Sequence, residues 1–313
     1  MANPHNHDPH GGHAHHHHPA PPVGGGSAVF ALAVGLNLAF VAAEVAAGLI
    51  GGSMALLADA GHNLSDVLSL VLAWVASVLS ARPPSERFTY GLKSSSILAA
   101  IANAALLWVA IGGILVETIR RFGDPAPVAG GTVVAVAAIG IAVNALSALL
   151  FVRGSKGDLN LRAAFVHLMA DAAVSAGVVV AGLLILRTGL TWIDPAASLV
   201  VTAVIAWSSW GLMRDSVRLG MLGVPEGIDI AEVRRFLSAQ PGVTGVHDLH
   251  VWPMSTTESA LTAHLLIPGA YPGDAFLHAV ADELEHRFGI GHPTLQIETA
   301  GGNECALEDE AVV

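Results

Sequence analysis

Six apolar stretches constrain the fold of this chain more than any other feature of its sequence. Each is long enough, at about 20 residues, to cross the hydrocarbon core of a bilayer as a helix. Only 12% of the 313 residues are charged, against about 25% in a soluble globular domain. An integral membrane protein is therefore indicated. The expected spans are residues 28–50, 54–80, 95–119, 128–152, 160–187 and 193–213.

The charges between these spans predict the orientation of the chain. The loops after the second and fourth spans and the end of the sixth hold eight lysines and arginines, whereas the opposite side holds Arg120, Arg121 and Arg187. Positively charged loops stay in the cytoplasm, so both termini are predicted to be cytoplasmic. The sequence shows no organelle signal, which favours a bacterial inner (cell) membrane. The eight residues are Arg82, Arg87, Lys93, Arg153, Lys156, Arg162, Arg214 and Arg218.

Polar segments lie at both ends of the expected six-helix membrane domain, which we assign to residues 27–214. Residues 1–26 contain eight histidines in a low-complexity context that cannot bury a core, and they predict a disordered cytoplasmic tail. Flexible imidazoles there could gather metal ions; an expression tag is the alternative, which the irregular spacing disfavours. Residues 301–313 are expected to form a frayed acidic tail.

Between residues 215 and 300 the hydrophobic periodicity becomes that of a small soluble domain. The segments "IDIAEVRRFLSAQ" and "PGDAFLHAVADELEHRF" predict helices, and "GVHDLHVW", "SALTAHLLI" and "PTLQIET" predict strands. This αββαβ order predicts a cytoplasmic, ferredoxin-like α+β domain, with an antiparallel or mixed sheet and the helices on one face. The piece from residue 215 onward carries 15 acidic and four basic residues, which account for the whole net charge of −11. Cations rather than nucleic acid are the partners that such a charge favours.

Two His-x-x-x-Asp pairs, "HNLSD" and "HLMAD", lie inside the second and fifth spans. Side chains four residues apart share one helix face, so His62, Asp66, His167 and Asp171 could close around one ion. Two nitrogens and two oxygens suit tetrahedral Zn²⁺; Co²⁺ could use the same ligands, and monovalent copper would prefer sulfur. Hydrogen bonding between helices is the alternative, but two buried carboxylates are costly without a cation or proton.

Other polar residues in the spans have two interpretations each. Asp59 lies one helical turn before His62, where it could cap the helix or guide an ion. Four more could line a polar interior, although hydrogen bonding between neighbouring helices is the favoured reading. These four are Asn37, Glu44, Asn103 and Asn144.

The segments "EVAAGLIGGSMALLADAGHNLSD", "RFTYGLKSSSILAA", "HLMADAAVS", "GVPEGID" and "VHDLHVW" are spread over most of residues 28–299. Together they resemble the cation diffusion facilitator family of metal transporters. The resemblance implies six membrane helices, a cytoplasmic αββαβ domain and a homodimer that exchanges Zn²⁺ for protons. It places the transport ligands on His62, Asp66, His167 and Asp171. A histidine at position 62 implies selectivity for zinc, whereas aspartate there implies a broader range.

The same resemblance implies zinc ligands in the cytoplasmic domain at His247, His264, His278 and Glu298. Gln296 stands where some members carry another histidine, which leaves the number of ions open. In a regular strand His247 and the next residue, Asp248, point to opposite faces, so they cannot share an ion without a bulge. Bound Zn²⁺ would neutralise the repulsion between two acidic domains and draw them together; a permanent dimerisation domain is the alternative.

Cys305 is the only cysteine, so the chain can form neither an internal disulfide nor a cysteine-cluster metal site. It could add a ligand across a dimer. Because it is a lone thiol near a frayed end, the favoured interpretation is that it takes no part in metal binding. The loop after the second span, "RPPSERFTYG", contains neither aspartate nor histidine, so no metal site is expected in it.

These observations predict an antiporter that exports Zn²⁺ from the cytoplasm by alternating access, with Co²⁺ and Cd²⁺ as other cargoes. Metal binding needs neutral histidine and ionised aspartate, so it expels protons. An intramembrane metalloenzyme would keep an open coordination position, and no H-E-x-x-H segment is present. A metal sensor would not need six membrane helices. We therefore expect no enzymatic activity.

Overall fold

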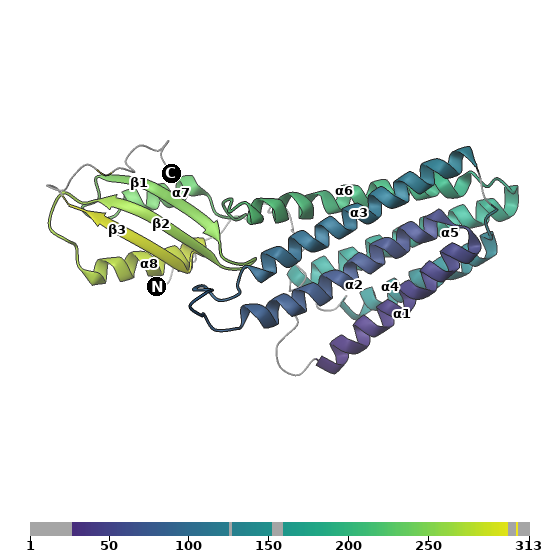
Figure 1. Ribbon diagram of the computed structural model, residues 1–313, viewed down its shortest axis with the longest axis horizontal. Coiled ribbons are helices and arrows are strands. Elements are labelled where there is room, and N and C mark those ends of the chain that lie inside the picture. Colours follow the sequence, from purple (N-terminus) through teal and green to yellow (C-terminus); the bar gives the residue numbers. More distant parts are fainter. Residues whose placement is uncertain (1–26, 125–126, 152–158, 300–304, 306–313) are drawn as a thin grey trace, which may run out of the picture. The chain divides into compact units, whose positions relative to one another are not determined.

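The computed structural model describes residues 27–124, 127–151, 159–299 and 305. The predictions for residues 1–26 and for most of 301–313 lie outside this part of the chain. The described residues form eight helices and three strands (Figure 1). In chain order these are α1 Ser27–Gly51, α2 Met54–Ser80, α3 Ser95–Gly123, α4 Gly130–Phe151, α5 Leu159–Thr188, α6 Ile193–Gly220, α7 Ile230–Ser238, β1 Gly245–Pro253, β2 Ser259–Leu266, α8 Asp274–Phe288 and β3 His292–Glu298.

Helices α1 to α6 occupy the six apolar stretches. Helices α2 to α6 are long and apolar enough to cross a membrane, and in α1 the residues described with their side chains include the apolar segment Asn37–Gly51. The helices end within a few residues of the predicted spans, except that α6 continues to Gly220. The membrane α-helical fold class is confirmed.

The chain divides into two compact units. The first contains the described parts of Met1–Leu70 and Val109–Ala206, and the second contains Val71–Trp108 and the described parts of Trp207–Val313. In the first unit α5 packs along α4, and α4 also contacts α1 (Figure 1). A side chain at Gly130 would place its Cβ 3.0 Å from the carbonyl oxygen of Gly182. Glycine at this crossing therefore allows α4 and α5 to approach closely.

The N-terminus of α2 is capped by a carboxylate from α6. Asp194 Oδ2 accepts a hydrogen bond from the backbone N–H of Met54 at 2.6 Å, and Oδ1 accepts from the hydroxyl of Ser53 and the N–H of Ala55. The first N–H groups of a helix have no partner within the helix, and a negative charge there is favourable. This cap fixes the helix that carries the first His-x-x-x-Asp pair.

The cytoplasmic domain, within the second unit, has the predicted αββαβ order. Strand β1 pairs with β2 antiparallel, and β2 pairs with β3 parallel, so the sheet is mixed, with the order β1-β2-β3. Leu261, Ala263 and Leu265 of β2 are buried in one cluster with residues of both α7 and α8. Because side chains alternate along a strand, both helices cover this face of the sheet. His264 therefore points to the other face.

The start of α3 contacts the loop between β1 and β2, also within the second unit. Lys93 Nζ forms an ion pair with the carboxylate of Glu258. The hydroxyl of Ser94 donates to the carbonyl oxygen of Met254 at 3.2 Å, and Ser96 Oγ accepts from the N–H of Thr256 at 3.1 Å. Three polar contacts thus join the cytoplasmic sheet to the beginning of a long apolar helix.

Candidate metal centres

The two His-x-x-x-Asp pairs converge in the first unit. His62 Nε2 lies 3.1 Å from Asp171 Oδ1, and His167 Nε2 lies 3.3 Å from Asp66 Oδ2. Within each helix the histidine also approaches its own aspartate, at 3.8 Å in α2 and 3.5 Å in α5. Each histidine therefore faces the aspartate of the other helix, as expected for two helices that cross a membrane in opposite directions.

The distances between each histidine and the two aspartates are those expected between ligands of a small tetrahedral ion. Ligand atoms about 2.1 Å from a tetrahedral Zn²⁺ lie about 3.4 Å from one another, and the four separations range from 3.1 to 3.8 Å. One ligand atom each from His62, Asp66 and Asp171 lies within 4.8 Å of the others, and His167 lies outside this group although its Nε2 contacts both carboxylates. The rings of His62 and His167 meet edge to face, with centroids 5.9 Å apart. This donor set suits Zn²⁺ or Co²⁺ better than monovalent copper.

Further polar groups lie beside this site in the first unit. Asp59 is buried and accepts a hydrogen bond from Ser175 Oγ at 3.0 Å. Glu44 of α1 is also buried and accepts one from Asn63 Nδ2 at 2.8 Å. Asp59 does not cap α2, since Asp194 occupies that position. Both carboxylates instead extend the polar interior from the four convergent side chains toward α1.

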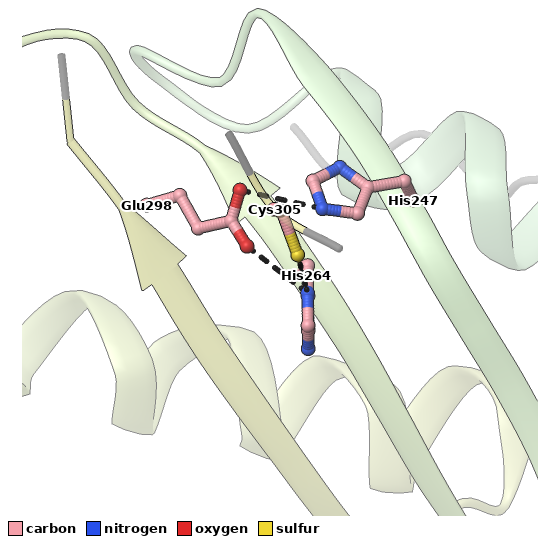
Figure 2. Close-up of side chains that lie close together, drawn as sticks. All are labelled: His247, His264, Glu298 and Cys305. Carbon is pink, nitrogen blue, oxygen red and sulfur yellow. Dashed lines mark hydrogen bonds and ion pairs between the residues drawn. The ribbon is translucent and has the colours of Figure 1, made fainter. Parts of the chain in front are cut away.

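A second cluster of possible ligands lies on the sheet face opposite α7 and α8. Strand pairing places His247, His264 and Gln296 in one row across the three strands. Glu298 follows two residues after Gln296 and so points to the same face. Its carboxylate oxygens lie 3.3 Å from His247 Nε2 and 3.0 Å from His264 Nδ1 (Figure 2).

Cys305 completes this cluster within one chain. Its Sγ lies 3.5 Å from His264 Nδ1 (Figure 2), and one ligand atom each from His247, His264, Glu298 and Cys305 lies within 4.8 Å of the others. Burial raises the pKa of Glu298, but the hydrogen bond with Cys305 and the charge of His247 outweigh it and leave the pKa below its usual value. The group offers two nitrogens, one oxygen and one sulfur, all donors that zinc accepts.

A β-bulge brings Asp248 to the same histidine. The register of β1 and β2 shifts between His247 and His250, and Asp248 has a φ of 49°. Aspartate tolerates this left-handed conformation better than most residues. Asp248 Oδ2 consequently lies 3.4 Å from His264 Nε2, while Oδ1 lies 2.9 Å from His250. The bulge thus brings Asp248 to the same face of the sheet as His247, which a regular strand would not allow.

His278 lies elsewhere. It is exposed on α8, and α8 packs on the face of the sheet opposite the cluster. Among the described residues of one chain, the cluster contains the other three predicted cytoplasmic ligands and Cys305. The spacing of the sequence did not indicate that Cys305 would join them, because it lies seven residues beyond the end of β3.

Two family models cover most of the chain. The cation efflux transmembrane domain matches residues 30–219, and the cytoplasmic domain of cation efflux proteins matches residues 225–300. The chain belongs to the cation efflux family. The resemblance inferred from the motifs is confirmed, and the family is one of divalent metal transporters rather than of enzymes.

Several bacterial relatives match over nearly their whole length. The zinc transporter ZitB of Escherichia coli is 38% identical over 281 residues, which are 88% of this chain and 90% of ZitB. The cadmium, cobalt and zinc/H(+)-K(+) antiporter of Bacillus subtilis is 36% identical over 83% of this chain and 85% of its own. The metal-bound C-terminal domain of the CzcD transporter from Cupriavidus metallidurans is 35% identical, covers 23% of this chain and 99% of that domain, and has a TM-score of 0.22.

Proposed function

We propose that this cation efflux protein exports Zn²⁺ from the cytoplasm through His62, Asp66, His167 and Asp171. The observation that carries the proposal is the convergence of two imidazoles and two carboxylates from α2 and α5, in which each histidine nitrogen lies 3.1 to 3.8 Å from both carboxylates, as ligands of a tetrahedral ion do. The names of the relatives, which include zinc, cadmium and cobalt, support a divalent cargo. Zinc is the first choice, and Co²⁺ and Cd²⁺ are further cargoes.

Exchange against protons follows from the chemistry of these ligands. An ion binds to neutral histidine and ionised aspartate, so loading the site releases protons, and protonating the site releases the ion. An unperturbed histidine has a pKa of about 6.5, within the range of cellular pH gradients. The name of the Bacillus subtilis relative includes H(+), which supports antiport. Inward flow of protons would then drive zinc outward.

The exposure of the four side chains supports loading from the cytoplasm. With both termini cytoplasmic, α2 runs inward and α5 runs outward, so Asp66 and His167 are the ligands nearer the cytoplasm. These two side chains are 26% and 27% exposed, whereas His62 and Asp171 are 13% and 7% exposed. We infer an inward-facing conformation, from which alternating access delivers the ion to the other side.

The cytoplasmic domain is proposed to bind a regulatory Zn²⁺ through His247, His264, Glu298 and Cys305. We propose a homodimer in a bacterial inner membrane, in which the ion reduces repulsion between two acidic domains. His278, exposed on α8, remains a proposed ligand across the dimer. The proposed boundaries are 27–214 for the membrane domain, 215–300 for the cytoplasmic domain and 301–313 for the acidic tail, with a histidine-rich tail at residues 1–26.

Reconstituted vesicles that contain a zinc-sensitive dye test this proposal. Wild-type protein is expected to carry Zn²⁺ across the membrane, and His167→Ala and Asp171→Ala are expected to reduce the flux to that of protein-free vesicles. Glu117→Gln is the control, because this half-exposed residue of α3 forms ion pairs with Arg120 and Arg121 and lies outside the four ligands. Wild-type vesicles that move no zinc would instead indicate a sensor or an intramembrane enzyme.

A further inference from the structure

Two buried carboxyl groups in the first unit take no part in the candidate ion site. Glu44 on α1 is 0% exposed and Asp59 on α2 is 1% exposed. The two side chains lie within hydrogen-bonding reach of each other. Asp59 precedes His62 by three residues, and Glu44 comes from a helix that supplies none of the four proposed ligands.

In each of these two carboxyl groups, one oxygen accepts a hydrogen bond and the other does not. Glu44 Oε2 accepts from Asn63, and Asp59 Oδ2 accepts from Ser175. The second oxygen of each group, Glu44 Oε1 and Asp59 Oδ1, is buried and has no donor among the described residues. Buried polar atoms in proteins nearly always have a partner. A hydrogen bond between two carboxyl groups requires one of them to be protonated, since ionised carboxylates only accept.

Asp194, in the same unit, is a buried carboxyl group whose two oxygens both have hydrogen-bond donors. It is as buried as Asp59, but both of its oxygens accept hydrogen bonds, from Ser53, Met54 and Ala55. It also lies at the N-terminus of α2, where a negative charge is favoured. Glu44 and Asp59 have neither the additional donors nor the helix terminus.

The nearby carboxyl groups also disfavour two negative charges on this pair. Asp59 acts in this direction on Glu44, and Asp66 and Asp171 do so on Asp59, whereas His62 favours the ionised form of both members. A positive His62 would already face Asp66 and Asp171 across the ion site. Like charges that share a buried site cannot both ionise readily, so one group retains its proton.

We propose that Glu44 and Asp59 form a proton-binding site, in which one proton is shared between the two carboxyl groups and the pair carries a single negative charge. Its part in transport rests on the proposed antiport function. Asp59 lies one helical turn before His62, so the pair gives a proton a position beside the ion site while the four ligands hold the metal. The proton site and the metal site are then separate, and different helices complete them.

Infrared spectroscopy of the purified full-length protein tests the site directly. A protonated buried carboxyl group has a C=O stretching band that is separate from the bands of carboxylates. This C=O band shifts in D₂O. Wild-type protein without zinc at neutral pH is expected to show this band. Glu44→Gln and Asp59→Asn are each expected to abolish it, because the new amide donates to the orphan oxygen of its neighbour and leaves that neighbour ionised.

Glu117→Gln, on an exposed ion pair, should leave the band unchanged. Zinc binding by each variant, measured by metal analysis, shows that the protein remains folded. Absence of the band in the wild type, or its persistence in both amide variants, would overturn the proton site; absence is also the result expected if a metal cation bridges the pair. Zinc flux that ignores a pH gradient while the band behaves as expected would refute the antiport function and leave the proton site standing.

Discussion

His264 holds a central position in the cytoplasmic cluster. Its Nδ1 faces Glu298 and Cys305, and its Nε2 faces Asp248. Nδ1 is therefore placed to bind an ion together with Glu298 and Cys305. Nε2 is placed to bond with Asp248, which would orient the ring. Metal-bound histidines commonly use their second nitrogen in this way, which fixes the tautomer and raises the basicity of the ligand.

Replacement of His264 by alanine is expected to weaken zinc binding by the cytoplasmic domain at least about tenfold, because it removes the residue that contacts the other members of the cluster. Cys305→Ser should have a smaller effect in the same direction, since oxygen replaces the softer sulfur.

Calorimetric titration of full-length protein measures binding of the cytoplasmic ion. The protein also carries Asp171→Ala, so that the membrane site is disabled. His286→Ala is the control, because His286 is exposed and bonds to the carbonyl oxygen of Asp282. Equal affinities for His264→Ala and His286→Ala would contradict the assignment.

The spacing of residues predicts local geometry better than it predicts long-range contacts. His62 and Asp66 share a face of α2 because a helix repeats every 3.6 residues, and this relation needs no other part of the chain. Asp248 reaches His264 only through a bulge with a left-handed residue. Cys305 joins the cluster through a segment after β3 that has no regular period. Neither contact could be deduced from the alternation of a strand.

The helices of the membrane domain were predictable because each contains its own hydrogen bonds and needs only an apolar stretch of sufficient length. Their terminal contacts were not. The carboxylate that caps α2 comes from Asp194. It accepts a hydrogen bond from the N–H of Met54, which is 140 residues away in the sequence. In the apolar pattern Asp194 shows only as an acidic residue in the first turn of α6. Such caps depend on the packing of helices, which hydropathy does not specify.

Asp194→Ala is expected to destabilise the protein by about 2 kcal/mol or more, because it leaves the buried N–H groups of Met54 and Ala55 without an acceptor. Thermal unfolding in detergent measures the loss. The matched control is Asp229→Ala, which removes the exposed N-cap of α7, where the side chain accepts from the N–H of Ala231 at 2.8 Å. That change should cost about 1 kcal/mol. An equal or smaller loss for Asp194→Ala would show that the α2 cap contributes little.

The protein as a whole combines a candidate ion site in its membrane helices with an acidic domain that has its own cluster of candidate ligands. The contacts of Lys93, Ser94 and Ser96 with the β1–β2 loop join the sheet of that domain to the start of α3. Fold class and domain order followed from hydropathy and periodicity. The contacts of Lys93, Ser94 and Ser96 did not, because they join segments that lie about 160 residues apart in the chain.

In the proposed exchange, zinc leaves its four membrane ligands as protons bind to them. The initial rate of zinc transport by wild-type protein in vesicles, measured at fixed zinc concentrations and over a series of imposed pH gradients, tests it most directly. The rate should increase as the side that receives the zinc is made more acidic, and it should fall when an ionophore collapses the gradient. A rate that remains the same with and without the gradient would contradict the exchange.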